Sequence, residues 1–135
     1  MGRSRILQIA HFRAYPFNMK SLLKPLLAIS LTWNITLVAG VILNQNYALT
    51  RAAGGQFETF PSGIRVMYVV TLAVLIYQVL LFFTQVKRPP WIYKAFFILG
   101  LLSIGVNAIS RSANERWNVI PAIVIAYAFY LKWKE

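Results

Sequence analysis

The sequence predicts an all-α, polytopic integral membrane protein: a four-transmembrane-helix bundle with both termini in the cytoplasm. Three observations support this prediction. The composition is apolar, with 59% of the 135 residues hydrophobic and only 13% charged, whereas soluble domains carry about a quarter charged residues. Four apolar segments approach the length that a helix needs to cross a bilayer. Lysine and arginine gather on one side of the resulting chain.

The four predicted spans form one transmembrane domain over residues 22–133. They cover residues 22–44, 64–86, 91–109 and 117–132, and outer loops follow the first span (45–63) and the third (110–116). A helix crosses about 30 Å of hydrocarbon with about 17 to 25 residues, and the fourth segment is the shortest of the four. Lys24, Arg65 and Lys94 lie near the ends of their segments, where long side chains can reach the headgroups.

Residues 1–21 form a basic leader that we expect in the cytoplasm or at the membrane interface. The leader, the Lys87-Arg88 turn and the C-terminal Lys132 and Lys134 fall on one side of a four-span chain. The net charge of +11 therefore indicates topology, placing both termini against the anionic lipids of the cytoplasmic face. Nucleic-acid binding is not expected, because the basic residues are split among short juxtamembrane pieces. The small size and the charge bias favour a bacterial plasma membrane.

Turn residues separate the spans. Gly54-Gly55 and Pro61-Ser62-Gly63 predict an irregular first loop, with room for a short helix around residues 49–53. Pro89-Pro90 ends one helix and starts the next, so the second and third helices are expected to be antiparallel neighbours.

Polar residues inside the spans are candidates for contacts or for a path. Asn34 and Gln78 lie near the centres of the first two spans, where an unpaired amide is costly, so both are expected to face protein. On the third span Asn107 shares a face with Gly100 and Ser103. Either these amides form interhelical hydrogen bonds that fix helix register, or they line a polar path or bind a ligand. No span carries a charge near its midpoint, which disfavours proton- or ion-coupled transport.

The stretch 110–121, SRSANERWNVIP, connects the third and fourth spans on the outer side. Ser112 or Asn114 is expected to cap the last helix, with Glu115 in its first turn and Trp117 at headgroup depth. A pair of arginines above an amide is suited to bind a lipid phosphate or a carboxylate, or to contact a partner subunit. The candidates for such an anion, lipid or partner contact are Arg111, Arg116 and Asn118.

No catalytic residue, metal site or cofactor is predicted. The chain has no cysteine and a single histidine, which excludes thiolate chemistry, iron–sulfur clusters and haem ligation by two histidines. A lone glutamate in the outer stretch, without a neighbouring base or second carboxylate, gives no acid–base couple and no activated nucleophile. We therefore expect a protein that is not an enzyme.

The leading hypothesis is a non-enzymatic accessory or assembly subunit of a larger membrane complex. It fits the small size, the lack of reactive groups and spans whose outer faces can meet either lipid or protein. The alternatives are a small oligomeric transporter or channel with a polar path near Asn34 and Gln78, and a lipid-binding protein that uses Arg111 and Arg116. The expected partners are the lipid bilayer and either another membrane protein or further copies of this chain.

Overall fold

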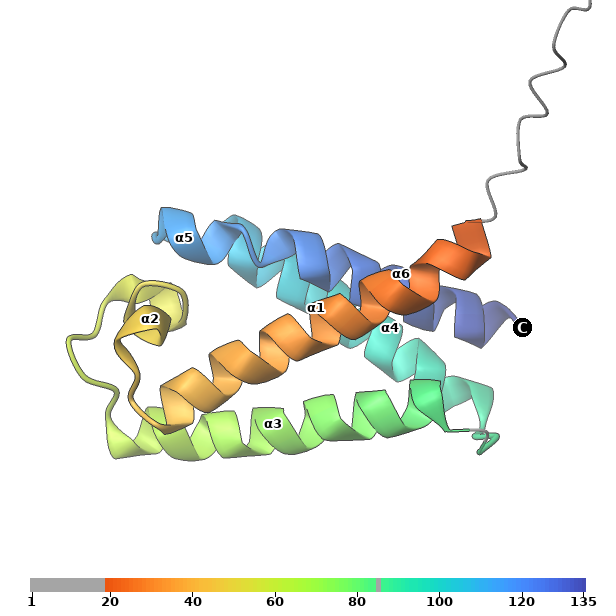
Figure 1. Cartoon of the computed structure of the whole chain (residues 1–135), viewed down its shortest axis with the longest axis horizontal. Coiled ribbons are helices and arrows are strands. Elements are labelled where there is room, and N and C mark those ends of the chain that lie inside the picture. The colour runs from red at the N-terminus through yellow and green to blue at the C-terminus, as the bar shows by residue number, and fades with distance from the viewer. Residues whose placement is uncertain (1–18, 85) are drawn as a thin grey trace, which may run out of the picture.

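The computed structural model of the chain describes residues 19–84 and 86–135, and the side chains from Ser21 onward. Every regular element in these residues is helical (Figure 1). The elements are α1 (Met19–Ile42), α2 (Asn46–Leu49), the 3₁₀ turn η1 (Ala53–Gly55), α3 (Ser62–Phe83), α4 (Pro90–Ala108), α5 (Ala113–Arg116) and α6 (Val119–Lys134). The basic leader predicted over residues 1–21 lies outside the described residues as far as position 18.

Three described helices are long and apolar enough to cross a membrane: Ser21–Ile42 within α1, α3 and α4. The all-helical prediction is therefore confirmed for the described residues, and three of the four predicted spans meet the requirements of a membrane crossing. The fourth segment differs. Helix α6 has 16 residues, or about 24 Å at 1.5 Å per residue, which is less than the roughly 30 Å of the hydrocarbon core.

Pro121 explains why α6 begins two residues later than predicted. A proline has no N–H, so it cannot donate to the carbonyl of Trp117 four residues earlier. That carbonyl instead accepts the N–H of Ile120 at 3.2 Å, in a tighter turn. The chain is thus divided at Trp117 and Asn118 into the short α5 and the longer α6.

Helix α1 ends two residues before the predicted boundary, because Asn44 adopts a left-handed conformation with φ 54°. The N–H of Gln45 donates to the carbonyl of Gly40 at 2.8 Å, and the N–H of Asn44 donates to that of Val41 at 3.1 Å. These two bonds are the Schellman pattern of a helix C-terminus. The Asn44 side chain also accepts the backbone N–H of Phe60 at 2.7 Å, so one residue ends the helix and anchors the following loop.

The four long helices pack as two pairs. Helix α4 lies along α6 and α3 lies against α1, while α1 crosses α6 (Figure 1). The expected contact between the second and third helices is present only in part. Helices α3 and α4 meet through the rings of Tyr77 and Phe96, with centroids 5.8 Å apart, but each packs mainly on another helix.

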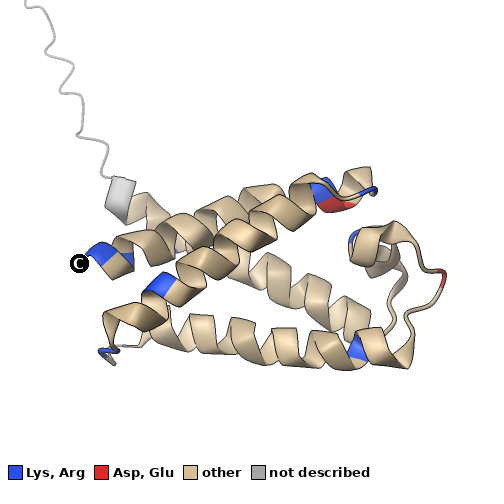
Figure 2. Cartoon of the chain, turned by 180° about the vertical axis from the view of Figure 1, so that it is seen from behind, with Lys and Arg blue, Asp and Glu red and all other residues tan. Residues whose placement is uncertain are grey.

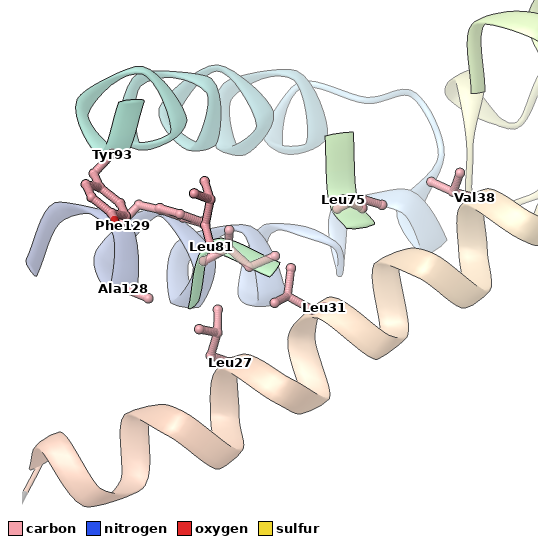
Figure 3. Close-up of a cluster of buried hydrophobic side chains, with 9 residues drawn as sticks. Leu27, Leu31, Val38, Leu75, Leu81, Tyr93, Ala128 and Phe129 are labelled. Carbon is pink, nitrogen blue, oxygen red and sulfur yellow. The ribbon is translucent and has the colours of Figure 1, made fainter. Parts of the chain in front are cut away.

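The main core lies between α1, α3 and α6, with Tyr93 added from α4 (Figure 3). Leu27, Leu31 and Phe129 are at most 1% exposed. Between α4 and α6 the backbones approach closely: a Cβ added at Gly100 would lie 2.7 Å from the Cβ of Ala126. Small residues at such a crossing allow the close packing that is typical of membrane helices.

The two ends of the bundle differ in charge. The loop end carries residues 43–61 and 109–118, with α2 and α5, and the basic end carries the start of α1, the 84–89 turn and the C-terminus (Figure 1). The carboxylates of Glu58 and Glu115 belong to the loop end (Figure 2). Lysines dominate the opposite end, where Lys24, Lys87 and Lys132 line one pocket.

The loop over residues 43–61 contains α2 and η1 and packs against α1, whereas its turn residues predict an irregular segment. Its short helix is α2, about one turn earlier than the expected position. Ala48, Ala52 and Phe60 are buried in a second cluster against Leu37 and Val41 of α1. The loop is therefore part of the folded domain.

Candidate functional site

The middle of the bundle contains a cavity of about 190 Å³ lined by all four long helices. Its polar lining residues are Asn34 from α1, Thr71 and Gln78 from α3, and Ser103 from α4. Thr71, Ser103 and the neighbouring Leu99 are exposed, so the cavity opens to the outside between α3 and α4. Because α3 and α4 pack mainly on other helices, this opening is not covered by direct helix contact.

Gln78 is the most buried polar side chain of the cavity, at 4% exposure. Its Oε1 has no hydrogen-bond partner among the described residues. Thr71 lies on the same stripe of α3, but its hydroxyl donates to the carbonyl of Met67 at 3.2 Å, within its own helix. A buried acceptor without a donor costs about 1 to 3 kcal/mol. Gln78 therefore leaves one buried acceptor at the wall of the cavity without a donor among the described residues.

Asn34 and Asn107 are placed differently from each other. The Nδ2 of Asn34 donates to the carbonyl of Ser30 at 2.9 Å on its own helix, although its side chain lines the cavity beside Gln78. The Nδ2 of Asn107 donates to the carbonyl of Ser103 at 2.8 Å, and Asn107 does not line the cavity. The structure thus brings Asn34 and Gln78 to one cavity and leaves Asn107 outside it.

A second polar site joins the two segments of the loop end around Glu115, which is 8% exposed. Its Oε2 accepts the hydroxyl of Ser110 and the backbone N–H of Gly54, the latter at 2.8 Å. Gly54 can present its N–H because φ is positive, at 75°, where glycine is readily accommodated. Beside this contact, the hydroxyl of Ser112 donates to the carbonyl of Thr50. The buried carboxylate of Glu115 thus links residues 110–116 to η1 by hydrogen bonds.

Asn118 completes this junction and is 4% exposed. Its Oδ1 accepts the indole N–H of Trp33 at 3.0 Å, and its Nδ2 donates to the backbone carbonyl of Arg51 at 3.0 Å. The guanidinium of Arg51 lies over the Trp33 ring, 5.6 Å from its centroid, at a cation–π distance. Asn118 therefore connects the start of α6 to α1 and to the first loop, and both ends of its amide are engaged within the chain.

Arg111 and Arg116 are both exposed. The Nε of Arg116 donates to the carbonyl of Ser110 at 2.7 Å, which holds this side chain against its own loop. Asn118 is committed to Trp33 and Arg51, so it does not complete an anion clamp with the two arginines. The three candidate residues of the outer stretch thus have separate roles in the structure.

Sequence reasoning missed the burial of Glu115 and the part played by Gly54. It placed Glu115 in the first turn of the last helix, capped by Ser112 or Asn114. In the structure Ser112 caps the separate α5 by accepting the N–H of Glu115 at 3.4 Å, and α6 begins after Asn118 without a side-chain cap. The partner of the carboxylate lies 61 residues away in the chain, in a turn that is defined only after folding. The glycine pair at 54–55 was the one available signal, because consecutive glycines permit left-handed backbone.

The described residues contain no group of three or more His, Cys, Asp or Glu side chains that could hold a metal ion. Both polar sites consist of amides, hydroxyls and one hydrogen-bonded carboxylate, which are suited to binding and packing. No protein-family model, curated protein or solved structure matches this chain.

Proposed function

We propose that the protein is a non-enzymatic accessory or assembly subunit of a larger membrane complex, which it contacts through the cavity between α3 and α4. One observation carries this proposal: Gln78 is almost fully buried, yet its Oε1 has no donor among the described residues. Hydrocarbon chains offer no donor at this depth, whereas a polar side chain of a neighbouring helix does.

The dimensions of the cavity favour a side chain as its occupant. About 190 Å³ is enough for one or two side chains and too little for a helix, whose diameter is about 10 Å. The partner is therefore a membrane helix that lies on the α3 and α4 faces and inserts a donor such as Ser, Thr, Asn or Trp. Because the Oε1 of Gln78 is covered in the isolated chain, its amide turns toward this donor when the partner binds. Helices α3 and α4 also carry large exposed apolar side chains, including Val70 and Leu102, which are 63% and 62% exposed.

We further propose that all four long helices cross a bacterial plasma membrane, with both termini in the cytoplasm. The positive-inside rule supports this orientation, because Lys and Arg are more numerous at the basic end than at the loop end. The start of α1 and the C-terminus lie at that same end of the bundle (Figure 1), as an even number of crossings requires.

A transporter that uses a path along Asn34, Gln78 and Asn107 has less support. Asn107 does not line the cavity, and the lining residues belong to the middle of the helices, so the cavity does not reach either end of the bundle. A phosphate clamp at Arg111 and Arg116 also has less support, because Asn118 is engaged elsewhere.

Photocrosslinking tests the subunit proposal. A photoreactive residue at Leu99, at the mouth of the cavity, should crosslink in cells to one membrane protein that co-purifies in stoichiometric amount in mild detergent. The same group at Ile29 is the matched control, since Ile29 is 67% exposed and does not line the cavity. Adding Gln78→Leu should reduce the Leu99 adduct severalfold. Equal crosslinking from both positions, or a lone homo-oligomer, would refute the proposal.

A further inference from the structure

The basic end contains a pocket of about 290 Å³ that is separate from the Gln78 cavity. Lysines from three parts of the chain line it: Lys24 of α1, Lys87 of the turn after α3, and Lys132 of α6. Tyr93, which is 9% exposed, and Thr84 add hydroxyl groups to its wall. Folding thus brings together cations that are more than forty residues apart in the sequence.

The charge in this pocket is not balanced by the described part of the chain. Lys132 pairs with Glu135 at 2.8 Å, and its ammonium lies 5.8 Å from the centroid of the Phe82 ring. Glu135 has the only acidic side chain at this end among the described residues, since Glu58 and Glu115 belong to the loop end. Three lysines against one carboxylate leave a net positive charge, which favours an anion.

A second hollow adjoins the lysine pocket along α3. It measures about 230 Å³ and shares Leu81, Thr84 and Val86 with the pocket. Tyr77 and Leu80 continue it toward the middle of the bundle. Leu80 is 51% exposed on the outer surface of an apolar helix, where acyl chains lie beside a membrane protein. A cationic pocket therefore continues into an apolar groove that runs along a predicted span.

We infer that this pair of hollows binds one anionic phospholipid. The lipid phosphate lies between Lys24, Lys87 and Lys132, and one acyl chain follows the groove beside Tyr77 and Leu80. Lysine ammonium groups bind phosphate as compact point charges with several donors each. A soluble phosphate would use the lysines but would gain nothing from the groove, which is why the adjoining apolar surface favours a lipid. The inference is independent of the partner proposed for the Gln78 cavity.

Native mass spectrometry of the full chain in mild detergent tests this site with equimolar phosphatidylglycerol and phosphatidylcholine. Lysines near the membrane surface attract anionic lipid, so the wild type should retain phosphatidylglycerol with about tenfold preference. The double variant Lys24→Gln/Lys87→Gln should reduce this preference to about twofold or less. Long-chain phosphatidylglycerol should also bind severalfold better than the dihexanoyl form, because only the long chain fills the groove.

The matched control is Lys94→Gln/Lys134→Gln, which removes the same charge from the same end. The ammonium groups of Lys94 and Lys134 lie 5.4 Å and 4.3 Å from the centroid of the Trp133 ring, and neither residue lines the pocket. This variant should keep the lipid preference. An equal loss in both double variants would overturn the inference in favour of diffuse surface charge. If millimolar inorganic phosphate displaces the lipid, and if binding does not depend on acyl-chain length, the pocket is a site for a free anion and the inference is overturned. Far-UV circular dichroism checks that both variants stay folded.

Discussion

The loop end and the central cavity bury polar groups to a similar degree and satisfy them differently. Glu115 and Asn118 are 8% and 4% exposed, and each has partners in the first loop. Gln78 is 4% exposed and its Oε1 has no partner in the described chain. Buried polar groups that complete a fold are usually hydrogen-bonded within it, so the exception at Gln78 calls for an explanation. The loop end is a junction whose polar groups are satisfied within the chain, and the cavity is the interface that we propose for a partner helix.

The largest expected effect is at the loop end. Glu115→Ala should lower the free energy of unfolding by about 3 kcal/mol, because it leaves the N–H of Gly54 and the hydroxyl of Ser110 without their acceptor. Unfolding by SDS in mild detergent, followed by circular dichroism, measures this change. Glu58→Ala is the control, since Glu58 is exposed in the other loop at the same end of the bundle and should change stability by less than about 0.5 kcal/mol. Equal effects of the two substitutions would contradict a structural junction at Glu115.

An intermediate effect is expected where α4 and α6 cross beside the cavity. Gly100→Ala should cost about 1 to 3 kcal/mol, because the new methyl group would lie 2.7 Å from the Cβ of Ala126 and force the helices apart. Gly105→Ala on the same helix is the matched control, with no atom within 4 Å of the added Cβ, and it should be neutral or slightly stabilising. The same SDS titration distinguishes them. If Gly100→Ala were also neutral, the cavity would reflect loose packing of the bundle as a whole.

The smallest effect, with the opposite sign, is expected at Gln78. In the purified chain Gln78→Leu should leave stability unchanged or raise it by about 1 kcal/mol, because it removes a buried acceptor that has no donor. Asn34→Leu should destabilise slightly, because it removes a bond to the Ser30 carbonyl. A loss of more than about 1 kcal/mol in Gln78→Leu would mean that the amide is already satisfied within the chain. That result would remove the contrast with the loop end.

Much of the helical layout could be predicted from apolar segment length. The start of α3 at Ser62 and of α4 at Pro90 lie within two residues of the predicted spans, because breaker residues mark both positions. The end of α1 was harder to predict, since Asn44 is polar but not a breaker and its left-handed conformation depends on the loop that it anchors. The start of α6 depended on a single missing N–H at Pro121.

The two polar sites differ in how far sequence could anticipate them. The position of Gln78 near a span centre, on one stripe with Thr71, is a local property of α3 that the sequence displays. Its lack of a partner depends on how α3 and α4 pack on other helices, which spacing does not specify. The burial of Glu115 could not be predicted, because it needs the backbone of Gly54 to arrive from a distant loop.

The shortness of α6 has a consequence for how the protein deforms its membrane. Five of its 16 residues are buried, against two of 19 in α4 and three of 22 in α3. The shortest of the four long helices is therefore better covered by its neighbours than α3 and α4 are. Lipids meet mainly the longer α3 and α4, whose lengths match a bilayer of ordinary thickness. In the four-span bundle that we propose, the contacts of α6 with α1 and α4 reduce the surface of this short helix that the surrounding bilayer has to match.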